Sequence, residues 1–387
     1  MIDIYSYDMV PLSDFLAEYK ELNANNRFRP VAVGRYGIRT RESIYSKELA
    51  QDYSKNKLIY KDTLTVGMGS VQMDIGILTD DITYSVSPAY HTYRINGINC
   101  DYLRFCLQAR NADMFERYKK RGSRQGKSID LKAWVHYLIP VYEIDGQLQI
   151  VSTLHKIQSI IDDRMQELQK LDDLVKARFV EMFGNPIENP MQWDTYSLKE
   201  CLERIDNGKS FICSDKPRTG DNPAILKLSA ATYGDYRSNE NKALLDESLF
   251  VESSEVHAGD LLFTRKNTPE LVGMAAYVLN TPPKLMMPDL IFRLVPNEKV
   301  NAVFLWLLIN CKEFRPAIQA ISGGSAKSMS NISKERLGKI KIICPPRELQ
   351  DFLIPFVKQV DKSKFVVQQA LDKAQLLFDS LMQQYFG

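Results

Sequence analysis

The most regular pattern of hydrophobic positions runs from Gln147 to Gly184. Apolar residues recur there in alternating steps of four and three, with no glycine or proline before the final Gly184, and the same register returns 203 residues later. Such spacing is typical of helices that pair as a coiled coil, so we predict long helices at 147–184 and 347–387. The positions that recur in this spacing form the seam along which one helix would pack on the other. The spacing also assigns Arg164 and Arg178 to the seam of the first helix. The seam residues are Leu154, Ile157, Ile161, Leu168 and Leu171 in the first helix and Val357, Val360, Val367, Leu371 and Phe378 in the second.

The residues before each long helix have a different pattern. Short runs rich in β-branched and aromatic residues alternate with turn residues, and one helical stretch interrupts each set. This texture predicts an α+β globular domain at 1–146 and a second at 185–346. A chain of 387 residues is also too long for one compact core.

The two globular segments resemble each other. "VPLSDFL" (10–16) matches "YSLKECL" (196–202), and "SPAYHTYRI" (87–95) matches "MPDLIFRLV" (287–295). Each match is loose, but the matches keep one order along the chain, which indicates a tandem duplication. The predicted fold class is therefore α+β, with two α/β domains in tandem, each followed by a long helix, and with the two helices paired as an antiparallel coiled coil.

The connections predict the antiparallel order. Only about a dozen residues join the first helix to the second globular segment, and the second helix starts from that same segment. To pair with the first helix it must run back, and at about 1.5 Å per residue roughly 36 residues make a spacer of roughly 54 Å. Gly184 and Gly387 are expected to be equivalent helix stops, because glycine readily adopts the left-handed conformation that ends a helix.

Composition narrows the class of protein. The hydrophobic content of 44% and charged content of 25% are those of an ordinary globular protein. The start "MIDIYSYDMV" has no basic, apolar leader, and the longest apolar run, 302–309, is far shorter than the roughly 20 residues of a membrane helix. The 6 cysteines show no metal or redox spacing, so we expect reduced thiols and a cytoplasmic location.

Basic residues cluster in the globular segments although the net charge is only +2. Arginine and lysine on loops can neutralise phosphates and reach base edges, whereas the simpler interpretation is that they are solvated loop charges. The candidate DNA-binding residues are Arg35, Tyr36, Arg39, Arg41, Lys119, Lys120, Arg121, Arg124 and Lys127 in the first segment and Lys209, Tyr236, Arg237, Arg265, Lys266, Ser325 and Lys327 in the second.

No catalytic motif is recognisable. "GSRQGKS" (122–128) has three residues between its glycines, where a phosphate-binding loop needs four. The 4 histidines have no ligand spacing. We therefore expect no catalytic residue, metal site or cofactor in the chain itself, and an enzyme acting at a domain cleft is the least favoured interpretation.

The whole chain resembles the specificity subunits of type I restriction-modification systems. The resemblance rests on the duplicated layout, on "AGDLLFTR" (258–265) and "SPAY" (87–90), and on the helices that end in Phe-Gly. It implies two target recognition domains, each reading one half of an asymmetric, interrupted site on double-stranded DNA. It also implies that the helices dock two methyltransferase subunits, to which restriction subunits attach. S-adenosylmethionine, ATP and Mg would then belong to those partners.

Two points stay open in the sequence. Where the second copy has Thr264-Arg265-Lys266, the first has Val66-Gly67-Met68, so a basic contact there is in doubt for the first domain. The alternative function is a two-domain coiled-coil scaffold that bridges proteins without binding DNA.

Overall fold

The computed structural model describes residues 6–34, 37–44, 52–121, 127–323 and 329–387, with only the backbone at Arg121 and Lys127. The chain forms two compact units. Unit 1 comprises Met1–Met165 and Gln369–Gly387, and unit 2 comprises Gln166–Gln368. Each unit thus contains part of both long helices, α4 (Ile144–Phe183) and α9 (Leu353–Phe386), whereas the sequence assigned one whole helix to follow each domain.

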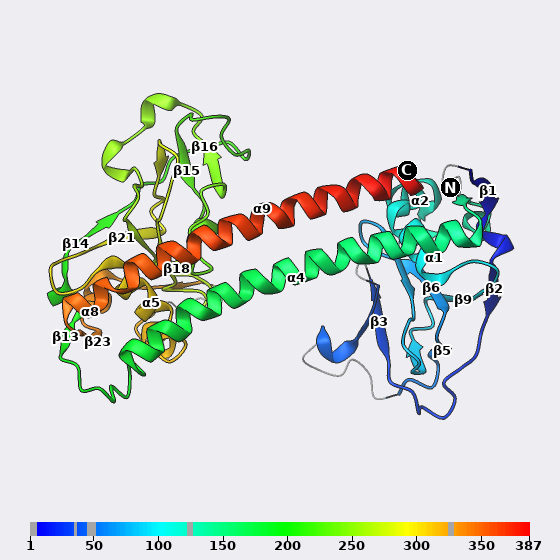
Figure 1. The fold of residues 1–387 in the computed structure, drawn as a ribbon, viewed down its shortest axis with the longest axis horizontal. Coiled ribbons are helices and arrows are strands. Elements are labelled where there is room, and N and C mark those ends of the chain that lie inside the picture. Colours follow the sequence, from blue (N-terminus) through cyan, green and yellow to red (C-terminus); the bar gives the residue numbers. More distant parts are fainter. Residues whose placement is uncertain (1–5, 35–36, 45–51, 122–126, 324–328) are drawn as a thin grey trace. The chain divides into compact units, whose positions relative to one another are not determined.

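Unit 1 is built around a mixed arrangement of short strands and helices (Figure 1). The described elements before α4 are β1 (Asp8–Pro11), η1 (Leu12–Asp14), β2 (Leu16–Tyr19), β3 (Val31–Gly34), β4 (Gly37–Thr40), η2 (Arg41–Ser43), β5 (Lys57–Ile59), β6 (Thr63–Met68), β7 (Met73–Ile77), β8 (Tyr84–Val86), β9 (His91–Ile95), α1 (Cys100–Ala109), α2 (Asn111–Tyr118), β10 (Lys119–Arg121), β11 (Lys127–Ile129), α3 (Leu131–Trp134) and β12 (Leu138–Val141).

Unit 2 repeats that order after the end of α4. Its described elements are β13 (Thr195–Ser197), η3 (Leu198–Cys201), β14 (Leu202–Asn207), β15 (Ala224–Leu226), η4 (Leu228–Ala230), β16 (Asn241–Ala243), η5 (Glu247–Leu249), η6 (Glu252–Ser254), β17 (Leu261–Thr264), β18 (Lys266–Asn267), β19 (Ala275–Tyr277), β20 (Leu285–Met286), β21 (Ile291–Pro296), α5 (Ala302–Asn310), α6 (Arg315–Ala320), β22 (Ser330–Asn331), α7 (Lys334–Gly338), β23 (Lys341–Ile343) and α8 (Arg347–Asp351).

The sheets of the two units have the same topology. In the described residues, the main sheet has the strand order β2-β9-β6-β7 in unit 1 and β14-β21-β17-β19 in unit 2. The first and last strands of each globular part also pair, β1 with β12 and β13 with β23. This correspondence confirms the tandem duplication predicted from the sequence.

Each unit also contains an equivalent pair of hydrogen bonds made by one buried glutamine side chain, which we call the clasp. The amide oxygen of Gln147 accepts from the N–H of Asn99 (3.0 Å), and its amide nitrogen donates to the Tyr142 carbonyl (2.8 Å). Gln350 makes the equivalent bonds to the N–H of Asn301 (3.0 Å) and the Pro345 carbonyl (2.7 Å). Each clasp joins the start of the long helical region to the N-terminal end of α1 or α5.

The long helices contribute to the cores in antiparallel order. The core of unit 1 includes Ile150, Leu154, Ile157 and Ile161 from the beginning of α4 together with Phe378, Met382 and Phe386 from the end of α9. The core of unit 2 includes Val175, Phe179 and Phe183 from the end of α4 together with Leu353, Val357 and Val360 from the beginning of α9. Of the other seam residues, Val367 is buried, and Leu168, Leu171 and Leu371 are half-buried.

The seam prediction is wrong at Arg178. This side chain is exposed and pairs with Glu181 (2.8 Å), whereas Phe179 is buried. The reason is that the last turns of α4 pack on the globular part of unit 2. The buried residues there are Val175, Phe179 and Phe183, so they recur every four residues and no longer in steps of four and three. The rings of Phe183 and Phe304 in α5 meet edge to face at 5.0 Å.

The end of α9 repeats this docking in unit 1. The Phe386 ring lies 5.3 Å from that of Tyr102 in α1, and Phe386 is fully buried. Gly184 follows the first of these anchors with φ +74°, as a glycine helix stop requires. In the repeated Phe-Gly, the phenylalanine anchors the helix end in both units, and at Gly184 the glycine lets the chain leave the helix.

Candidate nucleic-acid interface

Unit 1 has a surface cavity of about 580 Å³. It lies among strand β3, the end of β6, the turn before β9, and β11. The polar side chains that line it include those of Arg41, Asp74, Tyr90, His91 and Ser128. The cavity therefore brings together the chain around Arg41 and the hairpin β10-β11, which the sequence had singled out as two separate basic segments.

Tyr90 reaches this cavity because residue 67 is glycine. A Cβ atom at Gly67 would lie 2.4 Å from the Tyr90 ring, closer than any real contact. The Tyr90 hydroxyl donates to the Val33 carbonyl (3.0 Å), and the buried Lys57 ammonium donates to the Tyr90 carbonyl. These bonds fix the turn that forms one wall of the cavity.

Arg41 and Asp74 give the cavity opposite charges. The Arg41 guanidinium lies 5.3 Å from the centre of the Tyr53 ring, and its buried Nε has no hydrogen-bond partner among the described residues. The Asp74 carboxylate accepts a long bond from the Tyr90 hydroxyl (3.5 Å). Burial raises the pKa of Asp74 above its usual range, because desolvation disfavours the charged form.

The other predicted residues of unit 1 lie around this cavity or outside the described chain. Arg39 is exposed on β4. Lys119 and Lys120 pair with Glu116 and Asp130, and their β10 backbone is hydrogen-bonded opposite the cavity residues Ser128 and Ile129. Arg121 and Lys127 close the same hairpin. Arg35, Tyr36 and Arg124 lie outside the described residues.

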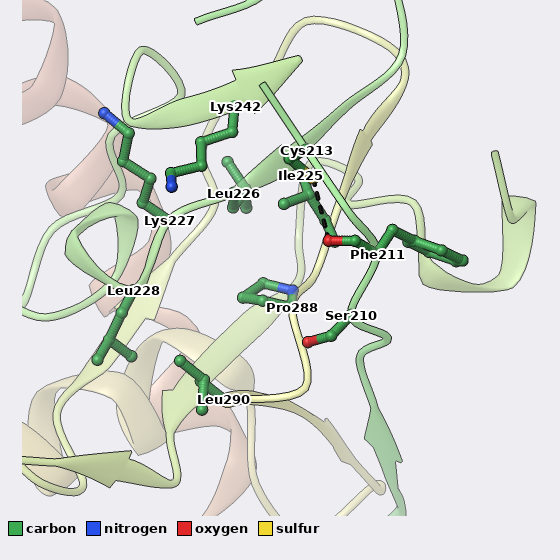
Figure 2. Close-up of a pocket in the computed structure, with 10 residues that line it drawn as sticks. All are labelled: Ser210, Phe211, Cys213, Ile225, Leu226, Lys227, Leu228, Lys242, Pro288 and Leu290. Carbon is green, nitrogen blue, oxygen red and sulfur yellow. Dashed lines mark hydrogen bonds between the residues drawn. The ribbon is translucent and has the colours of Figure 1, made fainter. Parts of the chain in front are cut away.

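Unit 2 has a smaller cavity of about 350 Å³ in the corresponding place, beside β15 and the turn before β21 (Figure 2). Its walls are mainly apolar, with Leu226, Pro288 and Leu290, and Lys227 and Lys242 contribute its positive charge. The two ammonium groups make only loose, exposed pairs with Glu240 (3.6 Å) and Asp215 (3.7 Å). Such pairs stabilise little, so both lysines can exchange partners at small cost.

Arg265 stands next to this turn but is held by the protein. Its guanidinium donates to the Asp289 carbonyl and to the Asn331 side chain, both at 3.3 Å, and lies 5.1 Å from the centre of the Phe292 ring. Lys266 follows in β18, which pairs with β22.

The remaining predicted residues of unit 2 do not converge. Lys209 is exposed beside the cavity residue Ser210. Tyr236 bonds to Thr281 (2.7 Å) and packs on the core cluster that includes Leu226, and Arg237 pairs with Asp235 (2.9 Å). Ser325 and Lys327 lie outside the described residues.

Sequence reasoning missed Asp74, Tyr90 and His91 in unit 1 and Lys227 and Lys242 in unit 2. The repeat did contain a signal, since "SPAYH" and "MPDLI" are the matching turns that border the two cavities. Searches of the described residues for three or more metal-ligating side chains, and for a helix able to cross a membrane, find neither.

The sequence of this chain is similar to known proteins of one family. Residues 190–373 match the family model of the type I restriction modification DNA specificity domain. The chain is also 32% identical over 202 residues to the type I restriction enzyme EcoEI specificity subunit of Escherichia coli. That alignment spans 51% of this chain and 34% of the relative. The resemblance to type I specificity subunits is thereby confirmed.

Solved structures show the same fold over the whole chain. The specificity subunit of a type I restriction-modification system from M. genitalium aligns with a TM-score of 0.57 at 12% identity, covering 99% of this chain and 96% of that one. A chain from a structure describing complex assembly and conformational transition of the type I system aligns with a TM-score of 0.53 at 16% identity, covering 99% and 98%. At these identities the likeness concerns the fold alone.

Proposed function

We propose that this chain is the DNA-recognition subunit of a type I restriction-modification complex, and that each unit reads one half of a bipartite, asymmetric site. The observation that carries this proposal is the pair of corresponding cavities, one per unit, each with basic side chains at its border. Two similar readers in one chain suit a site with two half-sites. The family match and the shared fold support the same function.

The long helices would provide docking surfaces for two methyltransferase subunits. The large apolar side chains of Phe365, Val366, Leu376 and Leu377 on α9 are more than half exposed. Exposed apolar patches of this kind mark protein interaction sites. Restriction subunits would join through that assembly in the cytoplasm. Methylation and cleavage, with S-adenosylmethionine, ATP and Mg, would then take place on the partners, and this chain would catalyse neither.

The decisive experiment is a binding assay of the full chain, alone and with a methyltransferase subunit, on a duplex library with two randomised half-sites. Recognition predicts that two fixed half-sites are enriched, and that affinity for them falls steeply as salt rises. Enrichment of no sequence would contradict the proposal, and the protein-bridging scaffold would then be the better explanation.

The spacer role has its own test. Seven residues inserted after Leu168 and seven after Leu371 keep the heptad register and lengthen each helix by roughly 10 Å. The preferred gap between half-sites should then grow by about one to three base pairs, with bending of the DNA absorbing the remainder. The half-site sequences should stay the same. A folded double-insertion protein that keeps the original gap would show that the helices do not set the spacing.

A further inference from the structure

The strand registers identify which residues of the two cavities are equivalent. Val66 pairs with His91 between β6 and β9, and Thr264 pairs with Ile291 between β17 and β21. Both pairs lie at the same end of matching sheets. The next residues, Gly67 in unit 1 and Arg265 in unit 2, therefore occupy one structural position.

The charged side chain at or directly opposite this position has opposite sign in the two units. In unit 1 the cross-strand partner of Gly67 is Asp74 on β7. In unit 2 the N–H of Gly273, just before β19, donates to the Thr264 carbonyl (2.8 Å), so a glycine lies opposite this end of β17. Unit 1 thus has the carboxylate of Asp74 on β7, and unit 2 has the guanidinium of Arg265 directly after β17, the counterpart of β6.

A carboxylate is an unusual lining for a surface that faces DNA. Phosphates repel it, so it weakens binding unless it meets a hydrogen-bond donor on the DNA. In the major groove those donors are the exocyclic amino groups of adenine and cytosine. Asp74 is half-buried in the cavity and has no ion-pair partner within the described part of the chain.

Building on the proposed function, we propose that Asp74 recognises an adenine or cytosine amino group in the half-site read by unit 1. Arg41, which lines the same cavity, would donate to an adjacent acceptor on the same base pair. Adenine offers N7 beside its amino group, and a cytosine–guanine pair offers the guanine O6. Arg265 gives unit 2 a donor at the equivalent position, so unit 2 would require a base acceptor there.

The experiment uses the full chain with a methyltransferase subunit and the half-sites selected from the random library. Each adenine in the unit 1 half-site is replaced in turn by purine, and each cytosine by pyrimidin-2-one, which lack only the amino group. One replacement should weaken binding of the wild-type protein about tenfold, within the range of one good base contact. Whether that replacement is at adenine or at cytosine identifies the base.

The variant Asp74→Ala should lose this sensitivity. The same replacement should change its affinity less than about twofold, and sensitivity at the other positions should remain. Asp81→Asn, a change at an exposed carboxylate outside the cavity, is the matched control and should behave like wild type. Arg265→Ala should change preferences in the other half-site only. Circular dichroism and hydrogen exchange would verify that each variant is folded.

The outcomes separate this inference from the proposed function. Selection of no half-sites at all would overturn both. Selection of half-sites in which every amino-group replacement affects wild type and Asp74→Ala equally would overturn the assignment of Asp74, while DNA recognition by the chain would stand.

Discussion

Gln147 and Gln350 occupy equivalent positions in the two units and make matching hydrogen bonds. Gly67 and Arg265 also occupy equivalent positions, but Gly67 lies opposite a carboxylate, that of Asp74, whereas Arg265 is itself a cation. The first pair is buried and joins helix to helix. In the second pair, Gly67 lines the unit 1 cavity, and Arg265 donates to the turn that borders the unit 2 cavity. The duplication is therefore retained where a change would leave a buried polar group unpaired, and it diverges beside the two cavities.

The largest expected effect tests the equivalence of the helix ends. Phe386→Ala should destabilise unit 1, and Phe183→Ala unit 2, by about 3–5 kcal/mol each, the usual cost of deleting a fully buried phenylalanine. Hydrogen exchange should show the loss of protection in α1 for the first variant and in α5 for the second. Phe365→Ala, at a phenylalanine exposed on α9, is the control and should change stability little. A loss of protection in the same helix for both variants would refute the equivalence.

A smaller effect should distinguish the two clasps. Gln350→Leu leaves unpaired the N–H of Asn301 and the Pro345 carbonyl, and it leaves the Lys299 carbonyl with the weak bond from the Cys344 thiol (3.4 Å). Gln147→Leu leaves unpaired the N–H of Asn99 and the Tyr142 carbonyl. We expect losses of about 3 and about 2 kcal/mol, because each buried unpaired group costs roughly 1–3 kcal/mol and part of that cost is relieved by water.

Denaturant unfolding monitored in each unit would measure the clasp variants. Gln149→Leu provides the control, since this neighbouring glutamine is exposed and its change should stay within about 0.5 kcal/mol. Equal losses for Gln149 and Gln147 would show that the clasp contributes nothing.

The smallest effect concerns one seam position at which the helices differ. Lys364 in unit 2 pairs with Asp172 at 2.6 Å, whereas the corresponding position in unit 1 is the buried Ile161. A partly exposed ion pair contributes about 0–1 kcal/mol, so Lys364→Ile should leave unit 2 as stable as before or more stable by up to about 1 kcal/mol. Lys364→Ala, measured by the same unfolding assay, isolates the ion pair. Destabilisation by Lys364→Ile equal to that by Lys364→Ala would mean that unit 2 needs the charge.

The helices show how far sequence periodicity extends. The heptad spacing correctly predicted two long helices in antiparallel order, because the seam residues repeat wherever one helix packs on the other. It failed at Arg178, since the spacing assumes that the partner is a helix throughout. The last turns of α4 instead pack on the side of α5, and only the repeated phenylalanines indicated this change of partner. The helix predicted to start at 347 is divided into α8 and α9, because Pro355 has no N–H to donate to the Asp351 carbonyl. The helix is interrupted at Phe352, and α9 begins at Leu353.

The cavities show what the sequence could not supply. Clusters of arginine and lysine are visible in a sequence, and Arg41 and the hairpin β10-β11 do meet at one cavity. Asp74 was invisible, because its position depends on the cross-strand pairing of β6 with β7. Lys227 and Lys242 lie fifteen residues apart and meet only because β15 and β16 pair. Long-range strand pairing decides which side chains share a surface, and local sequence patterns do not encode that pairing.

The burial of Phe378, Met382 and Phe386 in the core of unit 1 has a consequence for synthesis on the ribosome. Residues up to Gly184 emerge first, but the helix end that covers Tyr102 and Phe105 is made about 200 residues later. At roughly 5–20 residues per second, the apolar surface of α1 waits about 10–40 s for its own cover. Meanwhile the nascent chain exposes the aromatic site on α1 that receives Phe386, the counterpart of the α5 site that receives Phe183. Chains made close together on one messenger RNA therefore have time to exchange helix ends before either is complete.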